Sequence, residues 1–339
     1  MNNEGLWTSV TGSFPLINTE ENVRRAIEDQ INLGIEYPCY GQLESIITQF
    51  LLPLCEEVPE FENINDKFYL NNDFIIPNQP IGLKNVKFLM NLLETRKELK
   101  NRIKGTKGCL TGPFTLASEI ILKENLSQGI KSIVFNEPRA IMVDWIVQKL
   151  AEIMKNVAKA CNEIGVKIIS IDEPILGLLV GRKTMFHSED FIIETLNKVV
   201  SELNCLSSVH VCGQVSPKLR DILLKTDINI LDHEFQTNEN NYNIFNKNHF
   251  EKHDKYLAMG AVKTKIQKIE AGKISDYVES KTQLVKIVKK GIELYGKENL
   301  FIKPDCGFLP LRDTFEEEFA YEIAIRKLKN MVFAVNKLK

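Results

Sequence analysis

One unit repeats along this chain: a short apolar run that ends in polar residues and is followed by a helix-like segment. Eight such runs occur, at residues 6–10, 35–40, 108–110, 167–171, 206–211, 228–231, 256–262 and 300–302. Runs that stay apolar without alternation are typical of strands buried on both faces of a parallel sheet. Eight such strands joined by right-handed helical crossovers predict an α/β fold, a single (β/α)8 TIM barrel.

An open, doubly wound sheet is the competing architecture. That fold usually carries a glycine-rich phosphate turn after its first strand. Here the first run ends in Thr11-Gly12-Ser13-Phe14-Pro15, which lacks that pattern. We therefore expect one catalytic barrel domain over residues 1–339, with a segment inserted after the second βα unit. The insertion, residues 57–80, is rich in asparagine, proline and aromatic residues and predicts a hairpin or a lid.

Composition argues against several classes of protein. The 339 residues carry 43 basic and 45 acidic side chains, so neither nucleic acid nor an acidic membrane surface is an expected partner. No apolar run approaches the roughly 18 residues that a membrane span needs. The first five residues lack the features of an export signal. Seven cysteines without a dense framework favour reduced thiols, and we expect a cytoplasmic protein.

The polar ends of the runs supply a candidate metal site. Residues i and i+2 of a strand point to the same side, so His210 and Cys212 would point together. Such a pair alone is common among buried residues. In a barrel, however, all strand ends open onto one face, which would bring Glu234 and Cys306 to the same place. Two thiols, an imidazole and a carboxylate suit zinc better than magnesium or calcium, which prefer oxygen ligands.

Six motifs, in a characteristic order, cover essentially the whole chain: Thr11-Gly12-Ser13-Phe14-Pro15, Thr111-Gly112-Pro113, Ile171-Asp172-Glu173-Pro174, His210-Val211-Cys212, Glu234 and Pro304-Asp305-Cys306-Gly307. With these motifs the chain resembles the catalytic domain of cobalamin-independent methionine synthase. That family shares a superfamily with uroporphyrinogen decarboxylase and the corrinoid-linked methyltransferases. The resemblance implies a TIM barrel that methylates a thiol.

The resemblance also implies roles for individual residues. Four would bind a catalytic zinc ion: His210, Cys212, Glu234 and Cys306. The turn of Thr11, Gly12 and Ser13 would hold the carboxylate of homocysteine, and Asp172 would hold its ammonium group. Glu234 could give up its place on the zinc ion to the incoming sulfur. Asp172, which would hold the substrate, and Glu234 are the predicted catalytic residues.

Thiol chemistry gives zinc a purpose at such a site. A thiol with a pKa of about 8 to 9 is mostly protonated at neutral pH, whereas the thiolate is the nucleophile. A coordinated thiol is deprotonated by the metal, provided that the metal keeps an exchangeable position. The expected reaction is therefore attack of a zinc-bound thiolate on an activated methyl group, giving methionine when the thiol is homocysteine.

The chain departs from the pattern of the longer family members in three respects. Gln42 stands where they have a glutamate that contacts the amine of homocysteine, and we expect Gln42 to contact the substrate in its place. Lys263-Thr264-Lys265 replace an Asp-x-His that is thought to shuttle protons. The chain also begins at the catalytic domain, like the short "core" enzymes. Because a corrinoid leaving group needs no proton, the last two of these differences predict methylcobalamin or a methylated corrinoid protein as the methyl donor.

Three other interpretations remain open on the sequence. The acceptor could be another thiol such as coenzyme M, although Asp172 and the Gly12-Ser13 turn suit an amino acid better than a sulfonate. The protein could be a decarboxylase of the uroporphyrinogen type, which uses no zinc and does not account for the His and Cys set. It could also carry a closed structural zinc site without catalysis.

Overall fold

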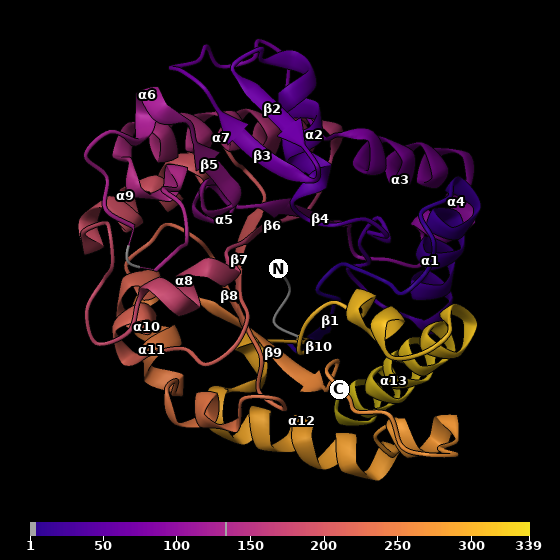
Figure 1. The fold of residues 1–339 in the computed structure, drawn as a ribbon. Coiled ribbons are helices and arrows are strands. Elements are labelled where there is room, and N and C mark those ends of the chain that lie inside the picture. The colour runs from indigo at the N-terminus through magenta and orange to yellow at the C-terminus, as the bar shows by residue number, and fades with distance from the viewer. Residues whose placement is uncertain (1–4, 133) are drawn as a thin grey trace.

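Seven parallel strands curl around a common centre in the computed structural model, which describes residues 5–132 and 134–339 (Figure 1). Their order around the sheet is β1 (Trp7–Thr8), β10 (Leu300–Pro304), β9 (Tyr256–Val262), β8 (Ile230–His233), β7 (Leu206–Val211), β6 (Ile168–Asp172) and β4 (Lys107–Thr111). Each strand pairs in parallel with the next one in this order. The order is that of a TIM barrel and confirms the predicted fold class.

The second predicted strand, residues 35–40, is the exception. It lies between β1 and β4, but the β-pairing observed for these residues is two isolated bridges, Ser9 with Tyr37 and Cys39 with Lys107. Pro38 stands between them and has no N–H to donate, although its carbonyl accepts from the backbone N–H of Lys107 at 2.8 Å. A regular ladder therefore does not close the sheet at this point, and the expectation of eight regular strands is wrong there.

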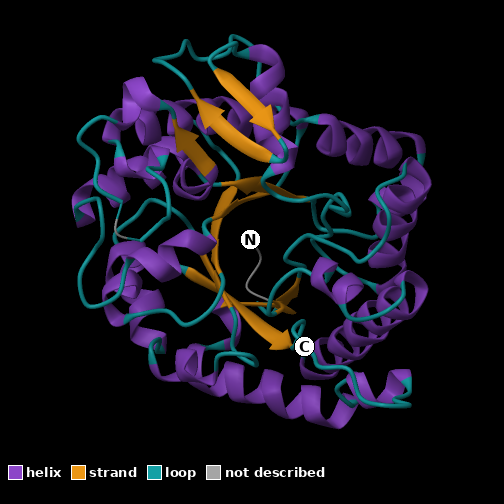
Figure 2. Cartoon of the chain, viewed as in Figure 1, coloured by secondary structure: helices purple, strands orange, loops and turns teal. Residues whose placement is uncertain are grey.

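Helices surround the curled sheet (Figure 2). The α-helices are α1 (Glu20–Leu33), α2 (Thr48–Glu57), α3 (Lys84–Thr95), α4 (Lys97–Lys100), α5 (Pro113–Glu119), α6 (Glu124–Ser127), α7 (Asp144–Ile164), α8 (Pro174–Leu179), α9 (Glu189–Val200), α10 (Pro217–Leu224), α11 (Lys247–His253), α12 (Lys281–Tyr295) and α13 (Glu317–Leu338). Short 3-10 helices occupy Ala140–Met142, Glu239–Asn243, Ile274–Tyr277, Lys297–Asn299 and Leu309–Asp313. Within the described residues, no helix has both the length and the apolar character needed to cross a bilayer.

The insertion forms the predicted hairpin. Strands β2 (Phe61–Ile64) and β3 (Lys67–Leu70) pair antiparallel around Asn65 and Asp66, which both have positive φ, as tight hairpin turns require. Strand β3 continues in parallel with β5 (Ile120–Leu122), which makes a second, three-stranded sheet. This sheet lies at the rim of the ring of helices, near α2 and α7 (Figure 1).

The inside of the curled sheet is filled in two layers. An apolar plug near the strand starts consists of Trp7, Tyr37, Ile168, Ile230, Ala258 and Phe301. Asp232 and Lys303 come two residues after plug members in their own strands, and alternation therefore points them inward as well. The Asp232 Oδ1 atom lies 2.5 Å from the Lys303 Nζ atom, and its Oδ2 atom lies 3.2 Å from the Lys107 Nζ atom. We call Lys107, Asp232 and Lys303 the ion layer.

Replacing Asp232 with asparagine should destabilise the barrel strongly, because the ammonium groups of Lys107 and Lys303 would lose their buried counter-charge. The expected loss in the free energy of unfolding is about 3 to 5 kcal/mol, measured by urea unfolding followed by circular dichroism. The exposed Asp221 of α10 provides the control, since Asp221→Asn should change stability by less than about 0.5 kcal/mol. Similar stability of the two variants would contradict this role of the ion layer.

Candidate metal centre and active site

Three potential metal ligands meet at the carboxyl ends of β7 and β10. The His210 Nε2 atom lies 2.9 Å from the Cys212 Sγ atom and 3.8 Å from the Cys306 Sγ atom. The two sulfur atoms are 3.2 Å apart. Zn–N and Zn–S bonds of about 2.0 to 2.3 Å allow the ligand atoms of one ion to lie up to about 4.6 Å apart, so all three separations fit a shared ion. His210 is buried and both cysteines are partly exposed.

His210 is held in the orientation that a metal ligand needs. Its Nδ1 atom lies 2.6 Å from Oδ1 of the buried Asp232, and because the carboxylate accepts, Nδ1 carries the proton. The Nε2 atom, which faces the two sulfur atoms, is the position at which a bound metal would replace the second ring proton. Burial opposes a charge on His210, but Asp232 outweighs burial and raises the pKa of the imidazole to about 9. Asp232 thus connects the ion layer to the candidate site.

The two thiols are electrostatically unequal. Because the sulfur atoms share a hydrogen bond, the pKa of Cys306 lies well below its ordinary value and the pKa of Cys212 lies well above it. The nearby imidazole of His210 lowers the pKa of Cys306 further. The shared hydrogen bond therefore favours the thiolate form of Cys306 over that of Cys212. Thiolate is the form that coordinates zinc, so this donor set fits the metal predicted from the sequence.

Glu234, the fourth predicted ligand, is not part of this close group. The ligand atoms of His210, Cys212 and Cys306 all lie within 4.8 Å of one another, and Glu234 does not join them. Its buried Oε2 atom accepts a hydrogen bond from the side chain of Asn238. Its Oε1 atom is also buried and has no hydrogen-bond partner. A carboxylate oxygen of this kind, next to a set of soft ligands, is suited to a metal or another cation.

Asp305 fixes the backbone around Glu234. Its carboxylate accepts backbone N–H groups from three consecutive residues after Glu234, namely Phe235, Gln236 and Thr237, at distances of 2.6 to 3.2 Å. Asp305 also directly precedes Cys306. Gly260 of β9 leaves the space for this carboxylate, since a Cβ atom at position 260 would lie 2.1 Å from the Asp305 Oδ1 atom. The strand ends that supply Glu234 and Cys306 are thereby tied to each other.

The predicted homocysteine-binding turn packs against the loop that carries Cys306. The Ser13 carbonyl accepts from the backbone N–H of Phe308 at 2.9 Å, and Ser13 Oγ accepts from that of Leu309 at 3.3 Å. Gly307 permits this contact, because a Cβ atom there would lie 2.0 Å from Ser13 Oγ. The turn and the candidate metal ligand are therefore neighbours in space, although about 290 residues separate them in sequence.

Gln42 and the first residues of the turn are held by further buried contacts. The backbone carbonyl of Gln42 accepts from the N–H of Phe14 at 2.9 Å, and its side-chain amide donates to Gln49 at 2.6 Å. The Thr11 hydroxyl donates to the carbonyl of Pro304 at 3.2 Å. The Gly12 carbonyl accepts from the thiol of Cys39 at 3.0 Å. These contacts fix the shape of the turn before any ligand binds.

Asp172 lies next to His210. The two residues are partners in the ladder between β6 and β7. Burial raises the pKa of the Asp172 carboxyl to about 6, while His210 and Lys107 oppose this shift. Its Oδ1 atom accepts from the hydroxyl of Ser170 at 2.9 Å. Above pH 6, Asp172 is therefore mostly a carboxylate that can receive a cationic group beside the candidate metal ligands.

The ion layer was not predicted from the sequence as part of the site. Lys107 and Lys303 are charged residues within otherwise apolar strands, and such residues require a buried partner of opposite charge. Asp232 stands two residues before Glu234, hence on the same side of its strand. These two signals together could have identified the ion layer, but which strands face each other depends on the closure of the barrel.

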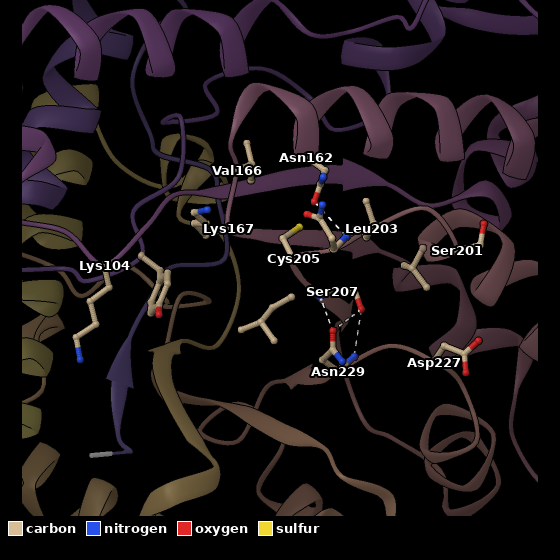
Figure 3. A pocket seen from close by; sticks show the side chains of 14 residues that line it. Lys104, Asn162, Val166, Lys167, Ser201, Leu203, Cys205, Ser207, Asp227 and Asn229 are labelled. Atoms are coloured by element: carbon tan, nitrogen blue, oxygen red, sulfur yellow. Dashed lines mark hydrogen bonds between the residues drawn. The ribbon is translucent and has the colours of Figure 1, made fainter. Parts of the chain in front are cut away.

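A pocket of about 730 Å³ lies at the opposite end of the barrel (Figure 3). Lys167, Leu206 and Asn229, which line it, precede or begin β6, β7 and β8. The side chain of Asn229 accepts from both the N–H and the hydroxyl of Ser207, as the dashed lines in Figure 3 mark. In TIM barrels, catalysis takes place at the carboxyl ends of the strands. This pocket is therefore separate from the candidate site.

Residues 90–337 match the family model described as the catalytic domain of the cobalamin-independent synthase. The chain belongs to this family. The methionine synthase of Methanocaldococcus jannaschii is 26% identical over 98% of this chain and 99% of its own. The solved structure of a B12-independent methionine synthase from Shewanella sp. W3-18-1, in complex with selenomethionine, has a TM-score of 0.68 and 17% identity. The superposed region covers 98% of this chain and 98% of the Shewanella chain, which supports the same fold.

A third relative bears on the methyl donor. The 5-methyltetrahydropteroyltriglutamate--homocysteine methyltransferase of Campylobacter jejuni subsp. doylei is 26% identical over 77% of this chain and 30% of its own length. That name and the cobalamin-independent family contradict the expected donor, methylcobalamin or a methylated corrinoid protein. The corrinoid expectation, which was inferred from Lys263-Thr264-Lys265 and from the likeness to the short "core" enzymes, was therefore wrong.

Substituting Gly260 with alanine should loosen the backbone after Glu234, because the new Cβ atom would displace the Asp305 carboxylate. We expect a loss of about 1 to 3 kcal/mol in the free energy of unfolding, with faster amide exchange at residues 235–237. Hydrogen exchange followed by mass spectrometry measures the latter. Gly181→Ala is the control, since no atom lies within 4 Å of its added Cβ. Unchanged exchange at 235–237 in Gly260→Ala would rule out this role for Asp305.

Proposed function

We propose that this chain is a zinc-dependent methyltransferase that methylates homocysteine to methionine. The observation that carries the proposal is the convergence of His210, Cys212 and Cys306 at the carboxyl ends of the strands, with Asp172 beside them. Membership of the synthase family supports the methyl transfer. The name of the Campylobacter relative supports homocysteine as the acceptor and a methyltetrahydropteroyl polyglutamate as the donor.

The proposed reaction exchanges one bond for another. The S–H bond of homocysteine breaks and its proton departs. A sulfur–methyl bond then forms while the bond between the methyl group and nitrogen 5 of the donor breaks. That nitrogen keeps the electron pair of the broken bond and takes up a proton. When bound, zinc would supply the positive charge that favours the thiolate form of the thiol at neutral pH.

The residues of the chain would prepare this reaction by position and charge. Asp232 keeps the proton of His210 on Nδ1, which leaves Nε2 available to the metal. Asp172 would bind the ammonium group of the amino acid, and the Thr11–Ser13 turn would receive its carboxylate. Because that turn packs against the loop of Cys306, a substrate held by both ends would present its sulfur near the metal ligands.

Replacing Cys306 with serine should abolish both zinc binding and methionine formation, because a hydroxyl is a poor substitute for a thiolate ligand. We expect one zinc ion per wild-type chain by plasma mass spectrometry after dialysis. We also expect methionine from homocysteine and the methyltetrahydropteroyl donor, with activity lost on chelation and restored by zinc.

The half-buried Cys205, at the other end of the barrel, provides the matched control. Cys205→Ser should retain zinc and activity. Stoichiometric zinc in Cys306→Ser, or methionine formation by the metal-free protein at the wild-type rate, would refute the proposal.

Asp172→Asn should weaken the use of homocysteine through the loss of a charge-assisted contact with its ammonium group. The expected result is about a 10- to 100-fold decrease in kcat/KM, carried mainly by KM. Coenzyme M, which has no ammonium group, serves as the comparison acceptor in steady-state assays. An equal effect of Asp172→Asn on both thiols would show that Asp172 does not recognise the amino group.

A further inference from the structure

Glu234 follows β8, which pairs with the strand that leads to Cys212, and its carboxylate lies close to a lysine of the β9–α12 loop. The Lys265 Nζ atom is 3.8 Å from the Glu234 Oε1 atom. The exposed fraction of the side chain is 1% for Glu234 and 59% for Lys265. Glu234 Oε1 is the same atom that has no hydrogen-bond partner. Lys265 is therefore a cation close to a buried carboxylate oxygen but not hydrogen-bonded to it.

The backbone of Glu234 is fixed, so only its side chain can reposition the carboxylate. Asp305 accepts the N–H groups of the three residues that follow. The Asn241 side chain donates to the Glu234 carbonyl at 2.8 Å. The carboxylate itself is held less firmly, since the contact from Asn238 engages Oε2 alone. Because Oε1 accepts no hydrogen bond, a rotation of the side chain would move this atom without moving the main chain.

Electrostatics makes Lys265 and a bound metal ion competitors for this oxygen. A buried carboxylate without a cationic partner is unfavourable, so Glu234 is stabilised by either positive group. The backbone N–H of Lys263, two residues earlier in the loop, donates to Glu279, and Glu279 also pairs with the buried Lys327. Among the described residues, Lys265 is the cation for which an ion pair with Glu234 is observed.

We propose that Lys265 is a positioning residue that competes with the metal for Glu234 and holds this carboxylate while the substrate sulfur occupies its place. This inference rests on the proposed zinc-dependent function. It assigns to the β9–α12 loop a role in opening the metal site to the thiol. Lys265 itself need not contact the substrate.

Zinc affinity measured without substrate provides the first test. Competition with a chromophoric chelator should show that Lys265→Met binds zinc about twofold to fivefold more tightly than wild type, because Glu234 loses its alternative partner. In the cobalt-substituted protein, the homocysteine concentration at half-maximal change of the visible spectrum should rise by a similar factor. Lys265→Arg, which keeps the charge, should resemble wild type.

Two further variants separate this role from general repulsion between a lysine and a metal ion. Lys268→Met, which removes an exposed lysine of the same loop, should leave zinc affinity unchanged. In a Glu234→Gln background, Lys265→Met should produce no tightening, since the carboxylate through which Lys265 acts is absent.

The outcomes distinguish this inference from the proposed function. Equal tightening with and without Glu234 would mean that Lys265 acts by direct repulsion and would overturn the inference. Unchanged zinc affinity in Lys265→Met, with normal zinc binding by the wild-type protein, would overturn it while the proposed function stands. A wild-type protein that binds no zinc would overturn both.

Discussion

The buried carboxylate of Asp232 is the interaction on which the rest of this structure depends. It faces the ammonium groups of Lys107 and Lys303 and the imidazole of His210, and so connects four strands of the barrel. Burial opposes ionisation of Asp232, but the surrounding cations, Lys303 first, hold its pKa well below the ordinary value. Charges buried at this depth are tolerated only when they are paired, so the curling of the sheet and the arrangement of the site depend on the same contacts.

A second carboxylate extends this order to the strand ends. Asp305 joins the backbone after β8 to the loop after β10, and Gly260 of β9 provides the room for it. The same loop packs against the Ser13 turn. The proposed site therefore combines a rigid frame with one carboxylate, that of Glu234, whose Oε1 atom has no hydrogen-bond partner. Such a division suits a metal that must be held firmly and yet accept a substrate ligand.

The loop after β9 shows how sequence and structure support different interpretations of the same residues. From the sequence alone, Lys263-Thr264-Lys265 predicted a methyl donor whose leaving group needs no proton. The cobalamin-independent family contradicts that donor. In the structure, Lys265 faces the Glu234 carboxylate. The physical consequence of the replacement is a positive charge next to a predicted metal ligand. The role that we propose for Lys265 is therefore inferred from its contact with Glu234 and not from the residue type that it replaces.

Local patterning in the sequence determined the strand order, the bounds of β7 and β9, the hairpin of the insertion and the inward direction of His210. These features depend on burial and alternation over a few residues, which a single chain displays directly. Tertiary structure alone decided that Pro38 interrupts the sheet, that Asp232 orients His210, and that Lys265 lies beside Glu234. Those outcomes depend on distances between residues far apart in the chain, and only the packing of the curled sheet and its helices sets such distances.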